Sequence, residues 1–201
     1  MGEKQIFQPL TREDKVTVAL YRTGIVLSAI IIAALAYFLM TVSARPGTTG
    51  VVPSVDILAY ALYASVGMSV FFIHLYVGSF KKFLMNLYYL SLAGLAALLF
   101  IGKGSPTGAF MHASYSPLLL LPLSGCLGFV TAKEAFCFKL FEGYLLAMIM
   151  PLYLLLISLG MLTGLGASSG LVLIAFLLVL FTLRKAFMPF AYDIGDKSAY
   201  R

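Results

Sequence analysis

Charged residues are scarce in this chain. Asp, Glu, Lys and Arg make up 11% of its 201 residues, whereas hydrophobic residues make up 61%. Soluble domains typically contain roughly 25% and 45–50% of these two classes. A soluble core of this size cannot hide so much apolar surface, so lipid is expected to be the solvent for much of the chain.

Acidic residues and cysteines are fewer still. The chain has eight Asp and Glu residues, and none of them clusters with a histidine in an apolar run, which argues against an enzyme. The two cysteines, Cys126 and Cys137, form no Cys-x-x-Cys pair, so neither a disulfide nor a metal site is expected. A cleavable signal peptide is not expected, because the first apolar run is longer than the roughly 7–15 residues of a signal h-region.

The sequence is instead rich in long apolar runs. Six of them lack Asp, Glu, Lys and Arg and are about 20 residues long, enough to cross a hydrocarbon core of roughly 30 Å as a helix. Their approximate bounds are residues 23–43, 57–80, 83–101, 113–132, 143–163 and 167–183. The sequence therefore predicts an all-α, polytopic membrane protein with six transmembrane helices in a single membrane domain over residues 1–201.

Basic residues are unequally divided between the two sides of these spans. Twelve lie on the side that would carry both termini, and only Arg45 and Lys103 lie on the other. The twelve are Lys4, Arg12, Lys15, Arg22, Lys81, Lys82, Lys133, Lys139, Arg184, Lys185, Lys197 and Arg201. The positive-inside rule predicts that both termini are cytoplasmic. The net charge of +6 is thereby attributed to topology and anionic headgroups, and no nucleic-acid partner is expected.

His74 is the ionisable side chain, tyrosines aside, that we predict inside a span. It precedes Lys81 by seven residues, about 10 Å at helical rise, and intramembrane polar groups often mark functional sites. Gly67 and Gly78 are expected on the same helix face. This face would leave space for a flat ring, which makes His74 a candidate ligand for the magnesium of a chlorophyll or bacteriochlorophyll; a carotenoid is the other pigment considered.

A hydrogen bond across the bundle is the alternative role for His74. Asn86, Tyr88 and Tyr89 are the candidate partners in the next span. A haem held by two histidines is excluded, because the only other histidine, His112, is expected at the opposite surface, roughly 20 Å away.

Two polar segments are candidates for docking a partner. Between spans, charges alternate with aromatics at Lys133, Glu134, Phe136, Phe138 and Lys139, a pattern typical of an interfacial segment. A solvated connection is the alternative there.

The second candidate docking segment is the C-terminal tail, with Asp193, Asp196 and Lys197. The two aspartates could also ligate a cation, but no third carboxylate lies nearby, so a structured tail is favoured. The string Gly166-Ala167-Ser168-Ser169-Gly170 matches the hydrolase pattern Gly-x-Ser-x-Gly only weakly, because that pattern requires a strand before the serine.

Three of these strings carry a family resemblance. They are Tyr21-Arg22-Thr23-Gly24, Lys133-Glu134-Ala135-Phe136-Cys137-Phe138, and Arg184-Lys185-Ala186 followed by Asp193-Ile194-Gly195-Asp196-Lys197-Ser198. Through them the chain resembles domain of unknown function 2301, an uncharacterised integral membrane family best represented in cyanobacteria and other phototrophs. The resemblance implies several transmembrane helices and a photosynthetic membrane, either thylakoid or cytoplasmic, and it brings no activity or catalytic residue.

These observations predict a non-enzymatic accessory, assembly or subunit protein of a photosystem or reaction centre, one that contacts pigment and other membrane proteins of the complex. The alternative is a small passive transporter or channel for a neutral solute. Ion-coupled transport is disfavoured, because we predict no Asp, Glu or Arg in the middle of a span.

Overall fold

The computed structural model describes residues 11–44, 52–75 and 77–194. Within these ranges the chain is helical and contains no strand. The elements are α1 (Arg12–Ala44), α2 (Val52–Phe72), α3 (Gly78–Ile101), α4 (Pro106–His112), the short 3-10 helix η2 (Ser116–Leu120), α5 (Leu121–Phe138), α6 (Phe141–Ser158), α7 (Leu165–Ala186) and α8 (Ala191–Ile194).

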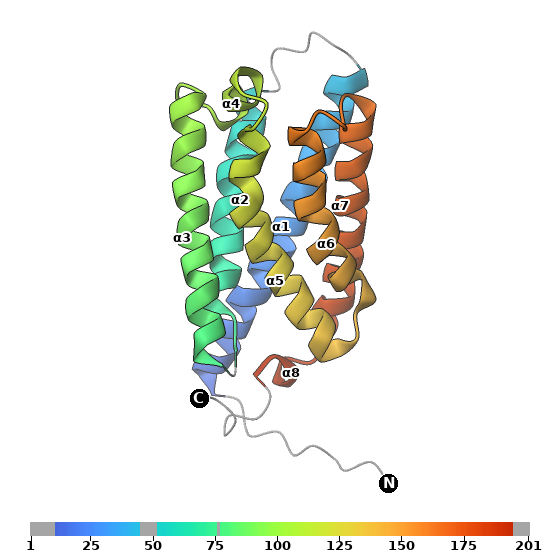
Figure 1. The fold of residues 1–201 in the computed structure, drawn as a ribbon. Coiled ribbons are helices and arrows are strands. Elements are labelled where there is room, and N and C mark those ends of the chain that lie inside the picture. Colours follow the sequence, from blue (N-terminus) through green and yellow to red (C-terminus); the bar gives the residue numbers. More distant parts are fainter. Residues whose placement is uncertain (1–10, 45–51, 76, 195–201) are drawn as a thin grey trace.

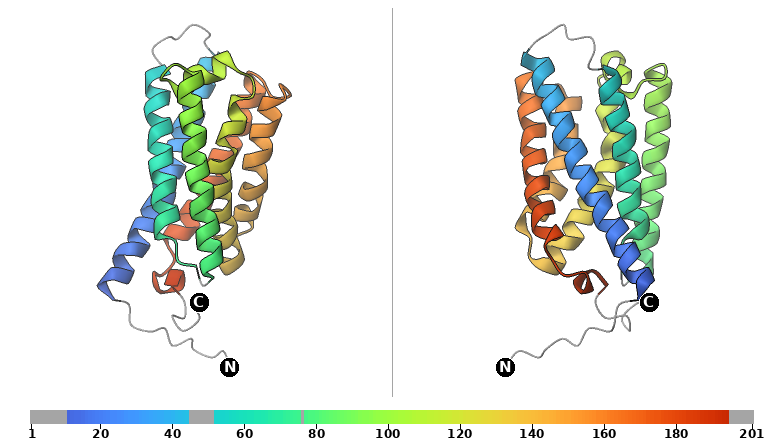
Figure 2. Two further views of the ribbon diagram at one scale, coloured as in Figure 1. Left: turned by 60° about the vertical axis from the view of Figure 1, so that its left-hand side comes forward. Right: turned by 180° about the vertical axis from the view of Figure 1, so that it is seen from behind.

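The six long helices run alternately up and down in one bundle (Figure 1). α8 and the start of α1 lie at one end, which we call the α8 end, and α4 lies at the opposite end, the α4 end. α1 packs against α2 and α7, as the view from behind in Figure 2 shows, and α5 packs against α3 and α6. Contacts between α2 and α3 and between α6 and α7 complete a ring of six helices.

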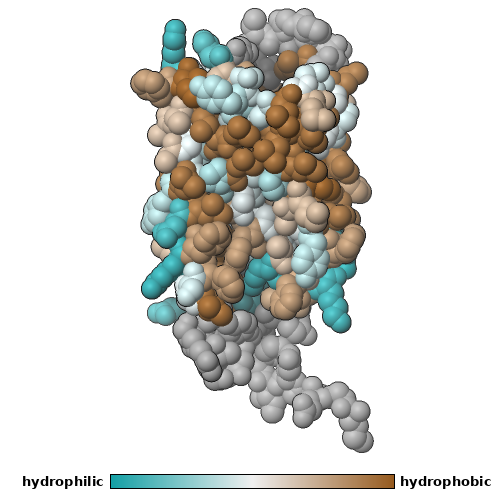
Figure 3. Space-filling model, in the orientation of Figure 1, coloured by the Kyte–Doolittle hydropathy of each residue, from teal (hydrophilic) through white to brown (hydrophobic). Residues whose placement is uncertain are grey.

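Six helices in the described ranges, with η2 and α5 together counting as one, are long and apolar enough to cross a membrane. The predicted all-α fold with six spans is therefore confirmed. In Figure 3 apolar residues cover most of the middle of the visible face, and the strongly hydrophilic residues lie toward its two ends. This distribution is expected of a bundle whose flanks face hydrocarbon and whose ends face headgroups and water.

The predicted boundary between the second and third spans is wrong. The predicted spans are 57–80 and 83–101, but α2 ends at Phe72 and α3 begins at Gly78. The turn between them is itself apolar, with Ile73, Leu75 and Val77, so the absence of charge concealed it. Lys81 and Lys82 lie in the first turns of α3 rather than between the two helices.

Two other helices continue beyond the charge-free runs. α1 begins at Arg12, well before the predicted start at residue 23, and α5 extends to Phe138 rather than ending near residue 132. Both extensions lie at the α8 end and carry charged residues in helical conformation. The charges that marked the ends of spans in the sequence are therefore parts of helices, and some of them turn inward.

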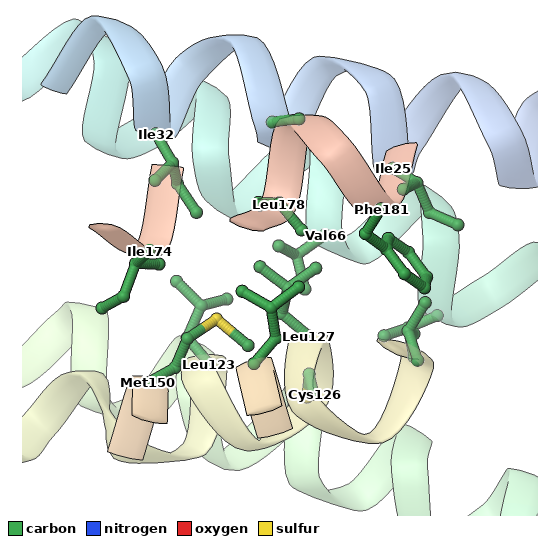
Figure 4. Close-up of a cluster of buried hydrophobic side chains, with 14 of the residues drawn as sticks. Ile25, Ile32, Val66, Leu123, Cys126, Leu127, Met150, Ile174, Leu178 and Phe181 are labelled. Carbon is green, nitrogen blue, oxygen red and sulfur yellow. The ribbon is translucent and has the colours of Figure 1, made fainter. Parts of the chain in front are cut away.

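Aliphatic side chains fill the middle of the bundle. Figure 4 shows them pointing toward one another from α1, α2, α5, α6 and α7. The labelled residues are Ile25, Ile32, Val66, Leu123, Cys126, Leu127, Met150, Ile174, Leu178 and Phe181, all of them buried. Close packing of these side chains fixes how the helices are spaced.

α1 and α2 approach each other closely at a glycine. A Cβ on Gly24 would lie 2.3 Å from Ser69 Oγ and 2.6 Å from the carbonyl oxygen of Ser65. One turn further along α1, the hydroxyls of Ser28 and Ser65 lie 2.9 Å apart in a hydrogen bond between the two helices. Small residues allow this backbone contact, and the serine pair satisfies polar groups that lipid cannot.

We expect Gly24→Ala to lower the Tm in detergent by several degrees. The new methyl group must displace the backbone of α2, and overpacking of this kind costs about 1–3 kcal/mol. Gly166→Ala is the matched control, since a Cβ there would meet only Leu162 Cδ2, at 3.4 Å. Thermal unfolding followed by helical circular dichroism measures both, and equal Tm values for the two variants would contradict the close contact.

Candidate functional site

Lys185 lies at the centre of a buried cluster of charges at the α8 end. Its ammonium group forms ion pairs with the carboxylates of Glu134 and Asp193. The three side chains come from α7, α5 and α8, and their exposed fractions are 2%, 0% and 5%. One cation therefore joins two carboxylates from different elements away from solvent.

Arg22 of α1 supplies the second cation. Its Nε donates to Asp193 Oδ2 at 2.6 Å. The guanidinium also donates to the carbonyls of Met188, at 2.5 Å, and Pro189, at 3.1 Å, and lies over the ring of Phe190. The turn between α7 and α8 thus surrounds the Arg22 side chain, which satisfies carbonyl groups left unpaired at the C-terminus of α7.

Tyr21 and Lys133 complete the cluster on the side of α5. The Tyr21 hydroxyl donates to Glu134 Oε1 at 2.6 Å, and the Lys133 ammonium donates to the same oxygen at 2.7 Å. Lys133 also lies over the ring of Tyr21, and Lys185 lies over the ring of Phe138 at 4.0 Å. Glu134 Oε1 thereby receives two donors and Oε2 is paired with the ammonium of Lys185, which compensates for the loss of water around the charge.

We call Tyr21, Arg22, Lys133, Glu134, Lys185 and Asp193 the charge network. It contains three cations and two carboxylates, and it joins α1, α5, α7 and α8. Buried ions are costly unless paired and hydrogen-bonded, and each charge in the network has such a partner. Its position at the end of the bundle, rather than its centre, keeps the cost of burial lower.

The network changes the interpretation of the predicted docking residues. Glu134 and Asp193 are buried and Lys133 is mostly buried, so these three do not form a docking surface; the prediction that they do is wrong. Phe138 is half-buried and contacts Lys185. The local sequence alternates charged and aromatic residues, but the helical turn directs Lys133 and Glu134 to the interior.

Two of the predicted docking residues do reach the surface. Phe136 is 80% exposed, and Lys139, which ends α5 with a left-handed φ of 55°, is exposed as well. Asp196 and Lys197 lie outside the described residues. Asp193, the one tail carboxylate that is described, is neutralised by Arg22 and Lys185, as expected of a structured tail.

His74 lies in the turn after α2 and not inside a helix, so the prediction that Gly67 and Gly78 share its helix face is wrong. Gly78 is the exposed first residue of α3. Gly67 faces Tyr88, whose hydroxyl would lie 2.3 Å from a Cβ there and donates to the carbonyl of Tyr63. The space beside Gly67 is therefore filled by a protein side chain.

The hydrogen bond of His74 crosses the bundle, as the alternative predicted, but to a different partner. Its Nε2 lies 3.2 Å from Thr17 Oγ1 of α1. The single hydrogen of the Thr17 hydroxyl is directed at the carbonyls of Glu13 and Asp14, so we assign the imidazole hydrogen to Nε2 and the lone pair to Nδ1. Nδ1 is buried and has no hydrogen-bond partner among the described residues.

The pocket beside His74 does not fit a chlorophyll. Its volume is about 200 Å³, and its lining includes Phe71, Phe72 and Lys81. Sites for drug-sized ligands are about 300–1,000 Å³, and a tetrapyrrole with its tail is larger than such ligands. With the space beside Gly67 also filled, the proposed role of His74 as a pigment ligand has no support in the geometry.

Burial is the main cause that lowers the pKa of His74 below its ordinary value of 6.5. The positive charges of Lys133 and Lys81 act in the same direction, and Asp193 and Asp14 oppose them. The imidazole is therefore neutral at pH 7, which agrees with a single hydrogen on Nε2.

The serine of the hydrolase-like string lies in the first turn of α7. Ser168 is buried, and its hydroxyl donates to carbonyls of its own helix turn, those of Gly164 and Leu165. Asp56, also at the α4 end, instead accepts hydrogen bonds from Ser105 Oγ and the backbone N–H of Thr107. The hydrogen bonds of Ser168 and Asp56 therefore go to other groups, and none of them joins the two side chains.

Sequence reasoning did not assign Tyr21, Arg22, Lys185 or Thr17 to a site. A signal for the first three was present, because they belong to strings that carry the family resemblance. The first of these strings precedes the other two by more than a hundred residues, yet the structure joins all three in one network. Thr17 had no such signal, because its role depends on where the turn after α2 lies.

Comparison with known proteins gives one match. A sequence model of the uncharacterised integral membrane protein family DUF2301 matches residues 68–201. No curated protein and no solved structure matches the chain. The matched region includes Lys133, Glu134, Lys185 and Asp193, whereas Tyr21 and Arg22 precede it.

Lys185→Met is expected to destabilise the protein by about 1–3 kcal/mol, because Glu134 Oε2 and Asp193 Oδ1 lose their shared buried donor, whereas Lys133 and Arg22 still pair with the two carboxylates. The same change at the exposed Lys82, which forms no ion pair among the described residues, is expected to cost less than about 1 kcal/mol. Denaturant or thermal unfolding in detergent measures both.

The triple variant with Lys185→Met, Glu134→Gln and Asp193→Asn tests the pairing. It leaves the buried Arg22 and the mostly buried Lys133 without a carboxylate, so it should lose more stability than Lys185→Met alone. If Lys185→Met were no less stable than Lys82→Met, the network would not hold the α8 end together.

The His74 pKa predicts a pH dependence of stability. Because the folded-state pKa is lower than 6.5, the unfolded chain takes up the proton first as the pH falls. Stability is thus fully present above pH 6.5 and decreases from there through the folded-state pKa. His74→Phe should show a shallower loss of Tm between pH 7.5 and 5. Other groups titrate in both proteins and cancel in the difference, so parallel curves would refute the prediction.

Proposed function

We propose, since the chain belongs to the uncharacterised integral membrane protein family DUF2301, that it is a non-enzymatic accessory or assembly subunit that docks other membrane proteins at its α8 end. The observation that carries this proposal is the charge network. It holds α1, α5, α7 and α8 in one arrangement and so fixes the residues exposed around it.

Exposed aromatic side chains surround the network. Phe136 near the end of α5 is 80% exposed, and Phe187 just after α7 is 87% exposed. Phe136 follows the buried Glu134 by two residues, so its backbone is held by the ion pairs beneath it. A preorganised aromatic anchor loses little conformational entropy on binding, which favours it as a docking contact.

The charges at the two ends support an orientation. All described Lys and Arg residues except Lys103 lie at the α8 end. By the positive-inside rule we propose that this end, with both termini, faces the cytoplasm. A partner would then bind on the cytoplasmic side, where Lys139 and Arg184 are exposed beside the aromatic side chains.

The filled interior favours docking over passage of a solute. Helices α1, α2, α5, α6 and α7 contribute buried apolar side chains to the middle of the bundle (Figure 4), and the buried charges lie at its α8 end. A neutral solute crossing the bundle would have to displace Leu123, Leu127, Ile174 and Leu178, all of which are buried. A passive transporter or channel is therefore the weaker proposal.

The photosynthetic setting is the second part of the proposal. It is supported by the resemblance of the three sequence strings to a family best represented in phototrophs. The partners proposed are membrane proteins of a photosystem or reaction centre, in a thylakoid or cytoplasmic membrane. Pigment contact through His74 is not included, because the pocket beside it is too small.

Gentle detergent extraction of the tagged chain from its own membrane tests both parts. We expect subunits of a photosystem or reaction centre to co-migrate with it, identified by mass spectrometry and an absorption spectrum. Phe136→Ser should reduce the recovered partner by at least about tenfold, because an aromatic hot spot contributes about 2 kcal/mol or more.

Phe100→Ser is the matched control for Phe136→Ser. Phe100 is 88% exposed but lies at the α4 end of α3, so its loss should leave the partner bound. Equal loss in both variants would refute docking at the α8 end. A partner without any photosynthetic subunit would refute the proposed setting.

A further inference from the structure

Two polar groups at the pocket beside His74 lack an interaction partner among the described residues. Its lining consists of Thr17, Phe71, Phe72, Ile73, His74, Leu75 and Lys81, from α1, α2, the following turn and α3. Nδ1 of His74 has a lone pair and no donor, and Lys81 has a charge and no carboxylate, among the residues that the structure describes.

The lone pair on His74 Nδ1 requires a hydrogen-bond donor. Because Nε2 donates to Thr17, Nδ1 can only accept. A buried acceptor without a donor is unfavourable and usually has a partner such as an ordered water or a ligand. A hydroxyl group is the simplest partner that fits a neutral imidazole.

The ammonium group of Lys81 requires an anion to pair with. Its side chain is half-buried at the pocket, and no described residue forms an ion pair with it. The neighbouring His74 supplies no negative charge, and the charges that act on its imidazole are Lys133 and Lys81 on one side and Asp193 and Asp14 on the other. A phosphate group would satisfy the ammonium with charge-assisted hydrogen bonds.

The position of the pocket indicates where such a ligand would come from. α2 ends at Phe72 and α3 begins at Gly78, so the pocket lies at the end of two membrane helices, at headgroup depth. Phe71 is 39% exposed, and an exposed phenylalanine on a membrane helix faces lipid. The volume of about 200 Å³ is suited to a headgroup rather than to acyl chains.

We propose that this pocket binds the headgroup of an anionic phospholipid that has a free hydroxyl, as phosphatidylglycerol does. The phosphate pairs with Lys81, the headgroup hydroxyl donates to His74 Nδ1, and the acyl chains lie along Phe71 in the bilayer. One ligand thus supplies both the hydrogen-bond donor for His74 and the anion for Lys81. The site is independent of the docking role proposed above.

Native mass spectrometry of the delipidated full chain, titrated with single lipids, tests the proposal. Phosphatidylglycerol should bind about tenfold or more tightly than phosphatidylcholine, which has neither net charge nor a headgroup hydroxyl. Phosphatidylethanol has the same singly charged phosphodiester without the headgroup hydroxyls and should bind with intermediate affinity. Equal binding of all three lipids would overturn the proposal.

Two pairs of variants assign the contacts. Lys81→Met should weaken phosphatidylglycerol binding at least about tenfold, whereas Lys82→Met, the same change one residue away and outside the pocket, should alter it less than about threefold. Equal effects would mean that only general attraction by positive charge is present, and the site would be refuted.

His74→Phe should bring phosphatidylglycerol binding down to the level of phosphatidylethanol and leave phosphatidylethanol binding unchanged. Thr17→Val is its control, because it removes the hydrogen bond to Nε2 and leaves Nδ1 in place. If both variants lost the preference equally, the contact of Nδ1 with the hydroxyl would be refuted. Helical circular dichroism checks that each variant is folded. If His74→Phe does not fold, the result for Lys81→Met decides the proposal.

Soluble glycerophosphoglycerol separates a lipid from a free anion. It has the same phosphodiester and headgroup hydroxyls but no acyl chains, so at millimolar concentration it should not raise the Tm, whereas phosphatidylglycerol should. An equal rise with both compounds would identify a soluble anion as the occupant and overturn the assignment to the bilayer.

Discussion

The ammonium group of Lys185, placed between two buried carboxylates, determines how the α8 end is built. Glu134 brings α5 to it and Asp193 brings α8 to it, while Arg22 of α1 holds Asp193 from the other side. Without this cation, Glu134 would keep Lys133 and Asp193 would keep Arg22, but no charge would join the two ion pairs. The turn around Arg22 and the direction of Phe136 both depend on these ion pairs.

The two ends of the bundle are held by different means. At the α4 end, Asp56 accepts hydrogen bonds from Ser105 Oγ at 2.6 Å and from the backbone N–H of Thr107 at 2.8 Å, which fixes the start of α4 against α2. At the α8 end, ion pairs between four elements replace such local bonds. The middle contains aliphatic side chains instead, because an ionised group costs most at the centre of the bilayer.

His74 illustrates how a small error in a helix boundary changes a functional hypothesis. Placed inside a span, it was a candidate pigment ligand on a face with Gly67 and Gly78. Placed in the turn after α2, it donates to Thr17 and exposes a lone pair to a small pocket beside Lys81. The residues are the same, but the change from helix to turn alters the neighbours of the imidazole. It therefore also alters the kind of ligand that the imidazole can bind.

The sequence by itself determined that this protein lies in a lipid bilayer, how many spans it has and at which end its basic residues gather. These properties depend on composition and on the length of apolar runs. It also marked Tyr21, Arg22, Lys133, Glu134, Lys185 and Asp193 as parts of three distinctive strings. Only the tertiary structure decided that they form one buried network. Whether a charged residue near a helix end faces water or the interior depends on which helices pack beside it, and that contact is set by residues more than a hundred positions away.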